Sequence, residues 1–286
     1  MNSKLARGAL ALVMAASSTC VTNRALASSA SSRASPSTPA PTPTPSPAPA
    51  SDSASASASA SIEGLLDHID DLFRGQSSET SLSMTVKTAH YERTMTMKAW
   101  SLGTDRTLIR ILAPLKEKGS ATLKSENTVY TYLPKTDRTI RLTSGMMGGS
   151  WMGSHFTNDD LVKEYRLRRD YTASVTFEGP RDGRRILEIT LKPKPEAAVV
   201  WGKLVLTVDA DARLPLEYTY FDEDMQPVRV ATFSDVADLG GRRLPRTMTM
   251  KPIDKPDEFT RITYESMKFD LPLSKDQFSV SALRRR

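Results

Sequence analysis

The sequence predicts a mostly β protein of the α+β class, in which a single antiparallel sheet curls into an open, unclosed barrel of about 11 strands. Segments of alternating apolar and polar residues follow one another with short turns between them from residue 82 to residue 269. This pattern is typical of an antiparallel meander. A domain of about 220 residues is too large for a flat sheet, so we expect the sheet to curl, with helices against its concave apolar face.

The first residues are typical of a secretory signal peptide. Lys4 and Arg7 precede an apolar run, and Ala25-Leu26-Ala27 supplies small residues at the positions that a signal peptidase reads. We expect residues 1–27 to be removed and the mature protein to lie in the periplasm. An alternative is that Cys20 carries a lipid anchor, although the residues before it form a poor lipid-attachment motif.

Residues 28–60 predict a disordered linker. They are almost entirely Ser, Ala, Pro and Thr, with only Arg33 and Asp52 charged. Such a segment cannot bury enough apolar surface to fold. Seven prolines between Pro36 and Pro49 favour an extended spacer. The folded domain is therefore expected at residues 61–286.

A first amphipathic helix is predicted at the start of this domain. Its apolar residues recur at helical spacing, Ser61 is placed to cap its N-terminus, and Gly75 follows its last turn. The apolar stripe must pack on another element of the fold. It consists of Ile62, Leu65, Leu66, Ile69, Leu72 and Phe73.

Strands are predicted from this helix to the end of the domain. Residues 82–86 and 95–99 alternate apolar and polar side chains and predict a first hairpin. Pro215 and Pro245 stand where a strand begins without losing a ladder hydrogen bond. The further strand segments are 107–112, 120–124, 128–133, 138–142, 172–178, 185–191, 203–208, 216–221, 228–236, 247–251 and 260–269.

Methionine takes alternating strand positions where Val or Ile would be stiffer. A concave face rich in flexible thioether side chains accommodates an irregular apolar guest, whereas a soft but filled core is the structural alternative. We interpret the strand methionines as candidate lipid-binding residues. They are Met84, Met95, Met97, Met248 and Met250.

Residues 146–156, which we call the gate segment, join large apolar side chains to glycines. A loop of this composition is expected to repack around an apolar guest, although a loop that plugs an ordinary core has the same composition. Gly148, Gly149 and Gly153 are candidate hinges. The candidate lipid-binding or gating side chains are Met146, Met147, Trp151, Met152 and Phe156.

A short helix is predicted directly after the gate segment. Thr157 is placed as its N-cap, and Asp160 is placed to return the capping-box hydrogen bond. Asp159 and Asp160 also suit the positive end of a helix. These roles explain both carboxylates without an acid–base function.

The composition argues against nucleic-acid binding and against thiol chemistry. The formal charge is +6, but the excess of basic residues lies in the signal peptide and in the last three residues, and the rest of the chain has equal numbers of acidic and basic residues. A nucleic-acid interface needs a concentrated basic face. Cys20 is the single cysteine, so the mature chain has no disulfide.

The sequence contains no pattern of an enzyme, a metal site or a cofactor site. His68, His90 and His155 are not spaced as ligands. Ser150 has Gly148 before it but Met152 after it, so a nucleophile elbow is not formed. We expect a protein that is not an enzyme and needs no cofactor.

Three segments resemble a known family. They are WSLGTDRTLIRILAPLKEKGSATL from Trp100, YTYLPKTDRTIRL from Tyr130 and MGSHFTNDDL from Met152. Together they are similar to the periplasmic outer-membrane lipoprotein-sorting proteins of the LolA-like superfamily, over residues 62–283. The resemblance implies an unclosed antiparallel barrel wrapped around helices, with an apolar cavity for acyl chains. The carriers of this family latch their lid with an arginine, and the resemblance does not identify which arginine of this sequence, if any, has that role.

The resemblance implies a monomeric carrier that shuttles the acyl chains of lipoproteins or lipids towards the outer membrane. Its expected partners are an inner-membrane transporter as donor and an outer-membrane acceptor. An alternative is a periplasmic sensor of lipids or mislocalised lipoproteins, which acts through a protein partner. A lipid hydrolase would depend on Ser150 or His155, and a purely structural envelope protein would have a filled interior.

Overall fold

The structure is a computed structural model and describes residues 51–163, 167–197 and 199–285. The expected signal peptide and residues 28–50 of the expected linker lie outside the described residues. Within the described ranges, no helix has both the length and the apolar character needed to cross a membrane.

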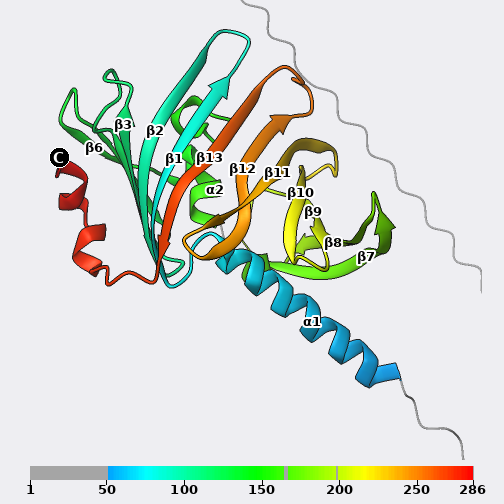
Figure 1. Ribbon diagram of the computed structural model, residues 1–286. Helices are drawn as coiled ribbons and strands as arrows, with labels where there is room; N and C mark the ends of the chain where they lie inside the picture. Colours follow the sequence, from blue (N-terminus) through cyan, green and yellow to red (C-terminus); the bar gives the residue numbers. More distant parts are fainter. Residues whose placement is uncertain (1–50, 164–166, 198, 286) are drawn as a thin grey trace, which may run out of the picture. The chain divides into compact units, whose positions relative to one another are not determined.

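Thirteen strands form one antiparallel sheet in the order β6-β5-β4-β3-β2-β1-β13-β12-β11-β10-β9-β8-β7 (Figure 1). The first half contains β1 (Ser77–Lys87), β2 (Glu92–Leu102), β3 (Arg106–Ala113), β4 (Ala121–Ser125), β5 (Thr128–Leu133) and β6 (Arg138–Arg141). The second half contains β7 (Tyr171–Arg181), β8 (Arg184–Pro193), β9 (Lys203–Asp209), β10 (Leu214–Phe221), β11 (Pro227–Leu239), β12 (Arg242–Pro252) and β13 (Phe259–Phe269).

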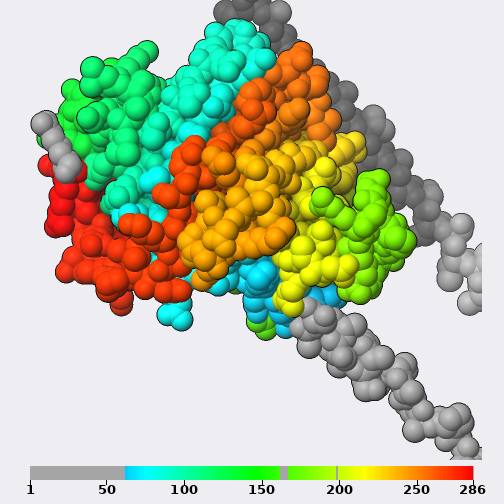
Figure 2. Space-filling view, in the orientation of Figure 1, coloured from blue at the N-terminus to red at the C-terminus, as the bar shows by residue number. Residues whose placement is uncertain are grey.

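Two meanders meet in the middle of this sheet. The first runs outward from β1 to β6, and the second runs inward from β7 to β13, which pairs with β1. In the space-filling view, β12 and β13 in orange lie between the cyan and the yellow strands (Figure 2). The edge strands β6 and β7 do not pair, so the barrel is open as predicted. Every predicted strand segment overlaps an observed strand, although the sheet has 13 strands instead of about 11.

The connection between β6 and β7 must cross from one edge of the sheet to the other. It contains the short helices η1 (Ser144–Met146), η2 (Trp151–Gly153), α2 (Asn158–Lys163) and α3 (Leu167–Asp170). In Figure 1, α2 lies behind the central strands. This topology carries the gate segment over the concave face.

Helix α1 (Ser51–Leu72) begins earlier than predicted. The expected N-cap at Ser61 is wrong, because the helix includes the Ser-Ala repeats before it. Alanine is the strongest helix former, and these repeats contain no glycine or proline that would stop a helix. The end at Leu72 agrees with the prediction, since the N–H of Gly75 donates to the carbonyl of Asp71 in a helix-ending turn. The predicted apolar stripe is buried: Leu65, Leu66 and Ile69 join a core cluster with Ile189, Leu191, Leu204 and Leu206.

The C-terminal segment covers the convex face of the sheet. It contains η3 (Lys275–Phe278) and η4 (Val280–Arg284), and Phe278 and Leu283 pack on Leu108 of β3. The neighbouring Ile109 joins the central cluster on the concave side, because successive strand residues point to opposite faces. The Arg110 guanidinium fixes the segment by donating to the carbonyls of Ala282 and Leu283, at 2.9 and 3.2 Å.

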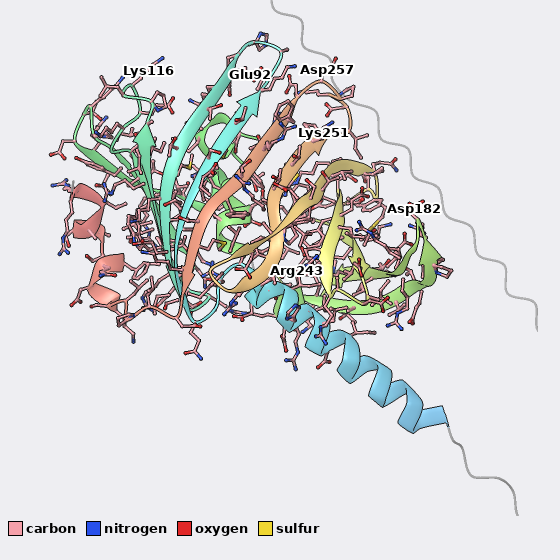
Figure 3. All side chains as sticks on the ribbon, in the orientation of Figure 1. Glu92, Lys116, Asp182, Arg243, Lys251 and Asp257 are labelled. Carbon is pink, nitrogen blue, oxygen red and sulfur yellow. The ribbon has the colours of Figure 1, made fainter. Side chains whose placement is uncertain are left out.

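One end of the sheet, which we call the upper rim, carries the turns β1–β2, β3–β4 and β12–β13. Figure 3 shows Glu92, Lys116 and Asp257 at this end and Arg243 at the opposite end. The alternating strand directions place these three turns together, because each strand pair reverses the chain. The upper rim is the part of the sheet that contacts the gate segment.

Candidate functional site

A predominantly apolar cavity lies on the concave face of the sheet. It contains about 1570 Å³ of space free of protein atoms, part of which is open to solvent. The strands, α1, the gate segment and the start of α2 contribute its walls. The gate contributes Trp151 and Phe156, the helices contribute Ile69, Phe73 and Leu161, and the sheet contributes Met84, Met97, Ile262 and Tyr264 among others.

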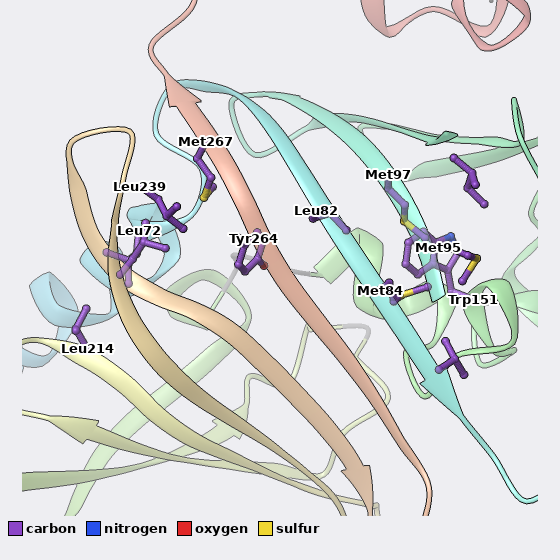
Figure 4. Close-up of a cluster of buried hydrophobic side chains, with 13 residues drawn as sticks. Leu72, Leu82, Met84, Met95, Met97, Trp151, Leu214, Leu239, Tyr264 and Met267 are labelled. Atoms are coloured by element: carbon purple, nitrogen blue, oxygen red, sulfur yellow. The ribbon is translucent and has the colours of Figure 1, made fainter. Parts of the chain in front are cut away.

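Five of the ten predicted lipid-binding or gating side chains line this cavity: Met84, Met97, Met248, Trp151 and Phe156. The other five lie outside its lining. Met95 and Met250 are fully buried, Met146 is exposed, and Met147 and Met152 are half-buried. Figure 4 shows Met84, Met95, Met97 and Trp151 grouped at one end of the central core.

Of the three predicted hinges, Gly153 is the position that requires glycine. Its φ of +66° lies in the left-handed region, and a Cβ there would stand 2.8 Å from the Tyr91 hydroxyl. Gly148 and Gly149 are exposed, and a Cβ at Gly148 would meet nothing within 4 Å. The chain therefore turns tightly at Gly153, where the gate meets the upper rim.

The turns of the upper rim hold the gate through its backbone carbonyls. The Tyr91 hydroxyl donates to the Gly153 carbonyl at 2.6 Å. Arg93 donates to the Met152 carbonyl and also pairs with Glu117 of the β3–β4 turn. Inside the gate, the Trp151 indole N–H donates to Thr122 Oγ1 at 3.2 Å. These hydrogen bonds join one loop to the β1–β2 turn, to β2 and to β4.

His155 attaches the gate to the β12–β13 hairpin. The backbone N–H of His155 donates to Thr260 Oγ1 at 3.0 Å, and its Nδ1 lies 2.9 Å from the same oxygen. Its Nε2 lies 3.1 Å from Glu258 Oε2. Glu258 also accepts from the backbone N–H of Ala89 at 3.0 Å, so this carboxylate connects both hairpins and the gate.

This connection predicts a pH-dependent stability. The pKa of Glu258 is lowered from 4.5, first by the Ala89 N–H and then by His155. A lowered carboxyl pKa stabilises the folded state above the ordinary pKa, and the stabilisation is lost as the pH falls through the folded value. We expect Glu258→Gln to lower the thermal midpoint at pH 7, and the difference from the wild type to disappear as the pH falls below the lowered pKa of Glu258. Asp257→Asn, at an exposed neighbouring residue, is the control. A loss of thermal stability in Glu258→Gln that is the same at pH 7 and at acidic pH would contradict the role of Glu258.

Arg229 of β11 forms the most extensive polar cluster of the site. Its guanidinium binds Asp160 with both terminal nitrogens, at 2.8 and 2.6 Å, and donates to the His155 carbonyl at 3.0 Å. Its guanidinium carbon contacts two adjoining rings, at 4.1 Å from the centroid of Trp201 and 4.2 Å from that of Tyr220, and the two ring centroids are 5.2 Å apart. Burial lowers the pKa of Arg229, but the Asp160 carboxylate and Tyr220 together raise it above its ordinary value, so this cation is permanent.

Arg229 was not predicted from the sequence as a residue of the site. The sequence did contain an indication of its position, because Arg229 alternates with the apolar residues Ala231 and Phe233 on one face of β11. Ala231 is fully buried, and Phe233 lines the cavity. An arginine at an inward strand position requires a buried partner, and its partner lies 69 residues away in the chain.

Asp160 has the predicted capping role and a second role. Thr157 N donates to Asp160 Oδ2 at 2.7 Å and Asp160 N donates to Thr157 Oγ1 at 3.2 Å, so the capping box is confirmed. The same carboxylate lines the cavity and pairs with Arg229. The start of α2 is therefore fixed to the sheet by one ion pair.

The opposite end of the cavity also carries polar groups with partners. Arg74 donates to Thr107 Oγ1 at 3.3 Å and to the Gly103 carbonyl, and the hydroxyls of Ser78 and Ser101 are 2.7 Å apart. Burial raises the pKa values of the Tyr171 and Tyr218 hydroxyls, which stay neutral. These hydroxyl and guanidinium groups give the cavity a polar part, which can bind a ligand by shape and hydrogen bonding.

The two candidate hydrolase residues, Ser150 and His155, make structural contacts in the described part of the chain. The Ser150 hydroxyl donates to the Ser154 carbonyl inside the gate, and the His155 ring contacts Thr260 and Glu258. No group of three or more metal-binding side chains occurs in the part of the chain that the structure describes.

Comparisons with known proteins identify the fold. A family model described as "Uncharacterized protein"-like matches residues 103–285. The chain belongs to this family and has the LolA-like fold. No curated protein matches the sequence significantly. The resemblance predicted from the sequence is confirmed.

Three solved structures share the LolA-like fold. A Vibrio parahaemolyticus outer membrane lipoprotein-sorting protein domain is 21% identical, with a TM-score of 0.67 over 78% of this chain and 98% of its own. A DUF1329 family protein of Desulfovibrio piger is 22% identical, with a TM-score of 0.69 over 79% and 98%. A LolA superfamily protein of Nitrosomonas europaea is 18% identical, with a TM-score of 0.66 over 77% and 98%.

Proposed function

We propose that this protein is a periplasmic carrier that binds acyl chains of lipoproteins or lipids in its cavity and delivers them towards the outer membrane. The main support for this proposal is the apolar cavity on the concave face. It is covered by the gate segment, which hydrogen bonds attach to the sheet, and the helix that follows is held by the Arg229–Asp160 pair. The name of the Vibrio relative supports the same class of cargo. Export through residues 1–27 and a spacer in residues 28–60 are part of this proposal.

The chemistry of the cavity suits a flexible chain. Transfer of an acyl chain from water contributes about 0.8 kcal/mol for each buried methylene group, so about a dozen contribute on the order of 10 kcal/mol before ordering costs. Thioether side chains such as Met84, Met97 and Met248 adapt to a guest of variable shape. A carrier needs this adaptable binding because it must also release its cargo.

The gate supplies a route for entry and release. Its attachments are hydrogen bonds, each with a net value of about 0.5–1.5 kcal/mol, and one ion pair to Arg229. Polar groups released from these bonds can bind water when the segment moves, and the buried Arg229–Asp160 ion pair is the attachment that most opposes opening. We infer that Arg229 latches the closed gate. A donor in the inner membrane and an acceptor at the outer membrane complete the proposed pathway.

Filling the cavity tests the proposal. Ala99 lines the cavity on β2, while Thr96 of the same strand is exposed on the other face. We expect Ala99→Trp to weaken binding of a fluorescent fatty acid by about tenfold or more, because the indole takes the space of several methylene groups. Thr96→Trp is the matched control and should bind as the wild type does. Equal binding by both variants would show that the probe binds elsewhere.

A further inference from the structure

The partners of Arg229 come from two different parts of the chain. Asp160 and the His155 carbonyl belong to the gate and to the first turn of α2. Trp201 lies just before β9, and Tyr220 lies on β10, so both rings belong to the sheet side of the cavity. If the gate moved away from the sheet, Asp160 would leave with it, whereas Trp201 and Tyr220 would stay beside the guanidinium.

Arg229 lies directly behind the cavity wall. Asp160, Trp201 and Tyr220 line the cavity, whereas Arg229 is 6% exposed and is covered by these three residues. Its Nε has no hydrogen-bond partner and is also buried. Withdrawal of Asp160 places a buried, permanently charged guanidinium on the wall. A buried cation without a partner is costly, so the open state favours an anion at this position.

We propose that Arg229 binds the anionic headgroup of an acyl ligand, which takes the place of the Asp160 carboxylate when the gate opens. The ligand class is an acyl chain that carries a carboxylate or a phosphate group. This inference rests on the proposed function and specifies its cargo. Asp160 is then a built-in competitor, which satisfies Arg229 while the cavity is empty.

The geometry fits this exchange. The two terminal nitrogens of Arg229 already donate to the pair of Asp160 carboxylate oxygens, at 2.8 and 2.6 Å. A planar guanidinium binds carboxylate and phosphate in the same two-pronged way. Contacts with the adjoining rings of Trp201 and Tyr220 restrict the guanidinium, so the site is ordered before the ligand arrives. The apolar cavity begins at the same residues and accepts the chain attached to the headgroup.

Three ligands with the same dodecyl chain length test the proposal: dodecanoate, dodecyl phosphate and dodecanol. Binding is measured at pH 8 by displacement of a neutral fluorescent hydrophobic probe from the full-length mature protein. We expect at least one anionic ligand to bind about tenfold or more tightly than dodecanol, since a hydrogen-bonded charge pair contributes more than a neutral contact. The stronger of the two anions identifies the headgroup as carboxylate or phosphate.

Two variants with opposite expected effects complete the test. Arg229→Gln should abolish the preference for the anion, so that this variant binds dodecanoate, dodecyl phosphate and dodecanol with similar affinity. Asp160→Asn should strengthen anion binding by several fold, because the competing carboxylate is gone. If Arg229→Gln does not fold, the Asp160→Asn result decides alone. Equal affinity for dodecanol and both anions, or no gain in Asp160→Asn, would overturn the proposal and leave the carrier function intact. Failure of all three ligands to bind would reject the carrier function itself.

Discussion

Arg229→Ala is expected to lower the free energy of unfolding by about 3–5 kcal/mol, because it leaves the Asp160 carboxylate in a largely buried site without its partner. The pair is well shielded from water, with 7% and 17% of the two side chains exposed. The substitution also removes the cation that contacts the rings of Trp201 and Tyr220. Urea unfolding measures the loss.

Arg246→Ala is the matched control for this prediction. Arg246 also pairs with a carboxylate, Glu265, at 3.4 Å, but both side chains are more than 40% exposed. Exposed ion pairs contribute about 0–1 kcal/mol. An Arg229→Ala loss as small as that of Arg246→Ala would show that the gate is not latched by this ion pair.

Trp151→Ala should have an effect of similar size, about 3–5 kcal/mol, because it removes a large buried ring from the central core. Trp151 is 6% exposed and packs with the cluster that contains Met84, Met95 and Met97. It also lines the cavity and belongs to the gate. We therefore expect faster release of a bound fluorescent fatty acid in addition to the lower stability.

Trp151→Phe separates the contribution of ring packing to stability from that of the indole hydrogen bond. Phenylalanine keeps most of the packing and loses the N–H that donates to Thr122. The expected loss of stability is about 0.5–1.5 kcal/mol, the net value of one hydrogen bond. Release rates that are unchanged in Trp151→Ala would mean that this ring belongs to the core alone and does not control the cavity.

The strands were predictable from the sequence because alternation of apolar and polar residues reports which face of a sheet is buried. The order of the strands was not. Pairing of β13 with β1 joins residues such as Met84 and Ile262 from opposite ends of the domain. Nothing in local alternation identifies a partner strand, so the edges β6 and β7 and the crossing of the gate could be seen only in the structure.

The candidate site was predictable in part for the same reason. Met84, Met95 and Met97 follow the same alternation and are all fully buried, but only Met84 and Met97 of these three line the cavity. Alternation assigns a face, whereas packing decides which side chains on that face meet the cavity. Asp160 illustrates a second limit, which is sequence distance. Its capping box with Thr157 spans four consecutive residues and was predictable, whereas its ion-pair partner Arg229 lies 69 residues away and was not.

Native mass spectrometry of the protein exported to the periplasm, followed by solvent extraction and lipid analysis, tests the central claim most directly. Our account predicts that the protein carries bound phospholipid, fatty acid or acylated peptide, and that Ala99→Trp carries less of it. A mass without ligand, together with no uptake of an added fluorescent fatty acid, would contradict the carrier function.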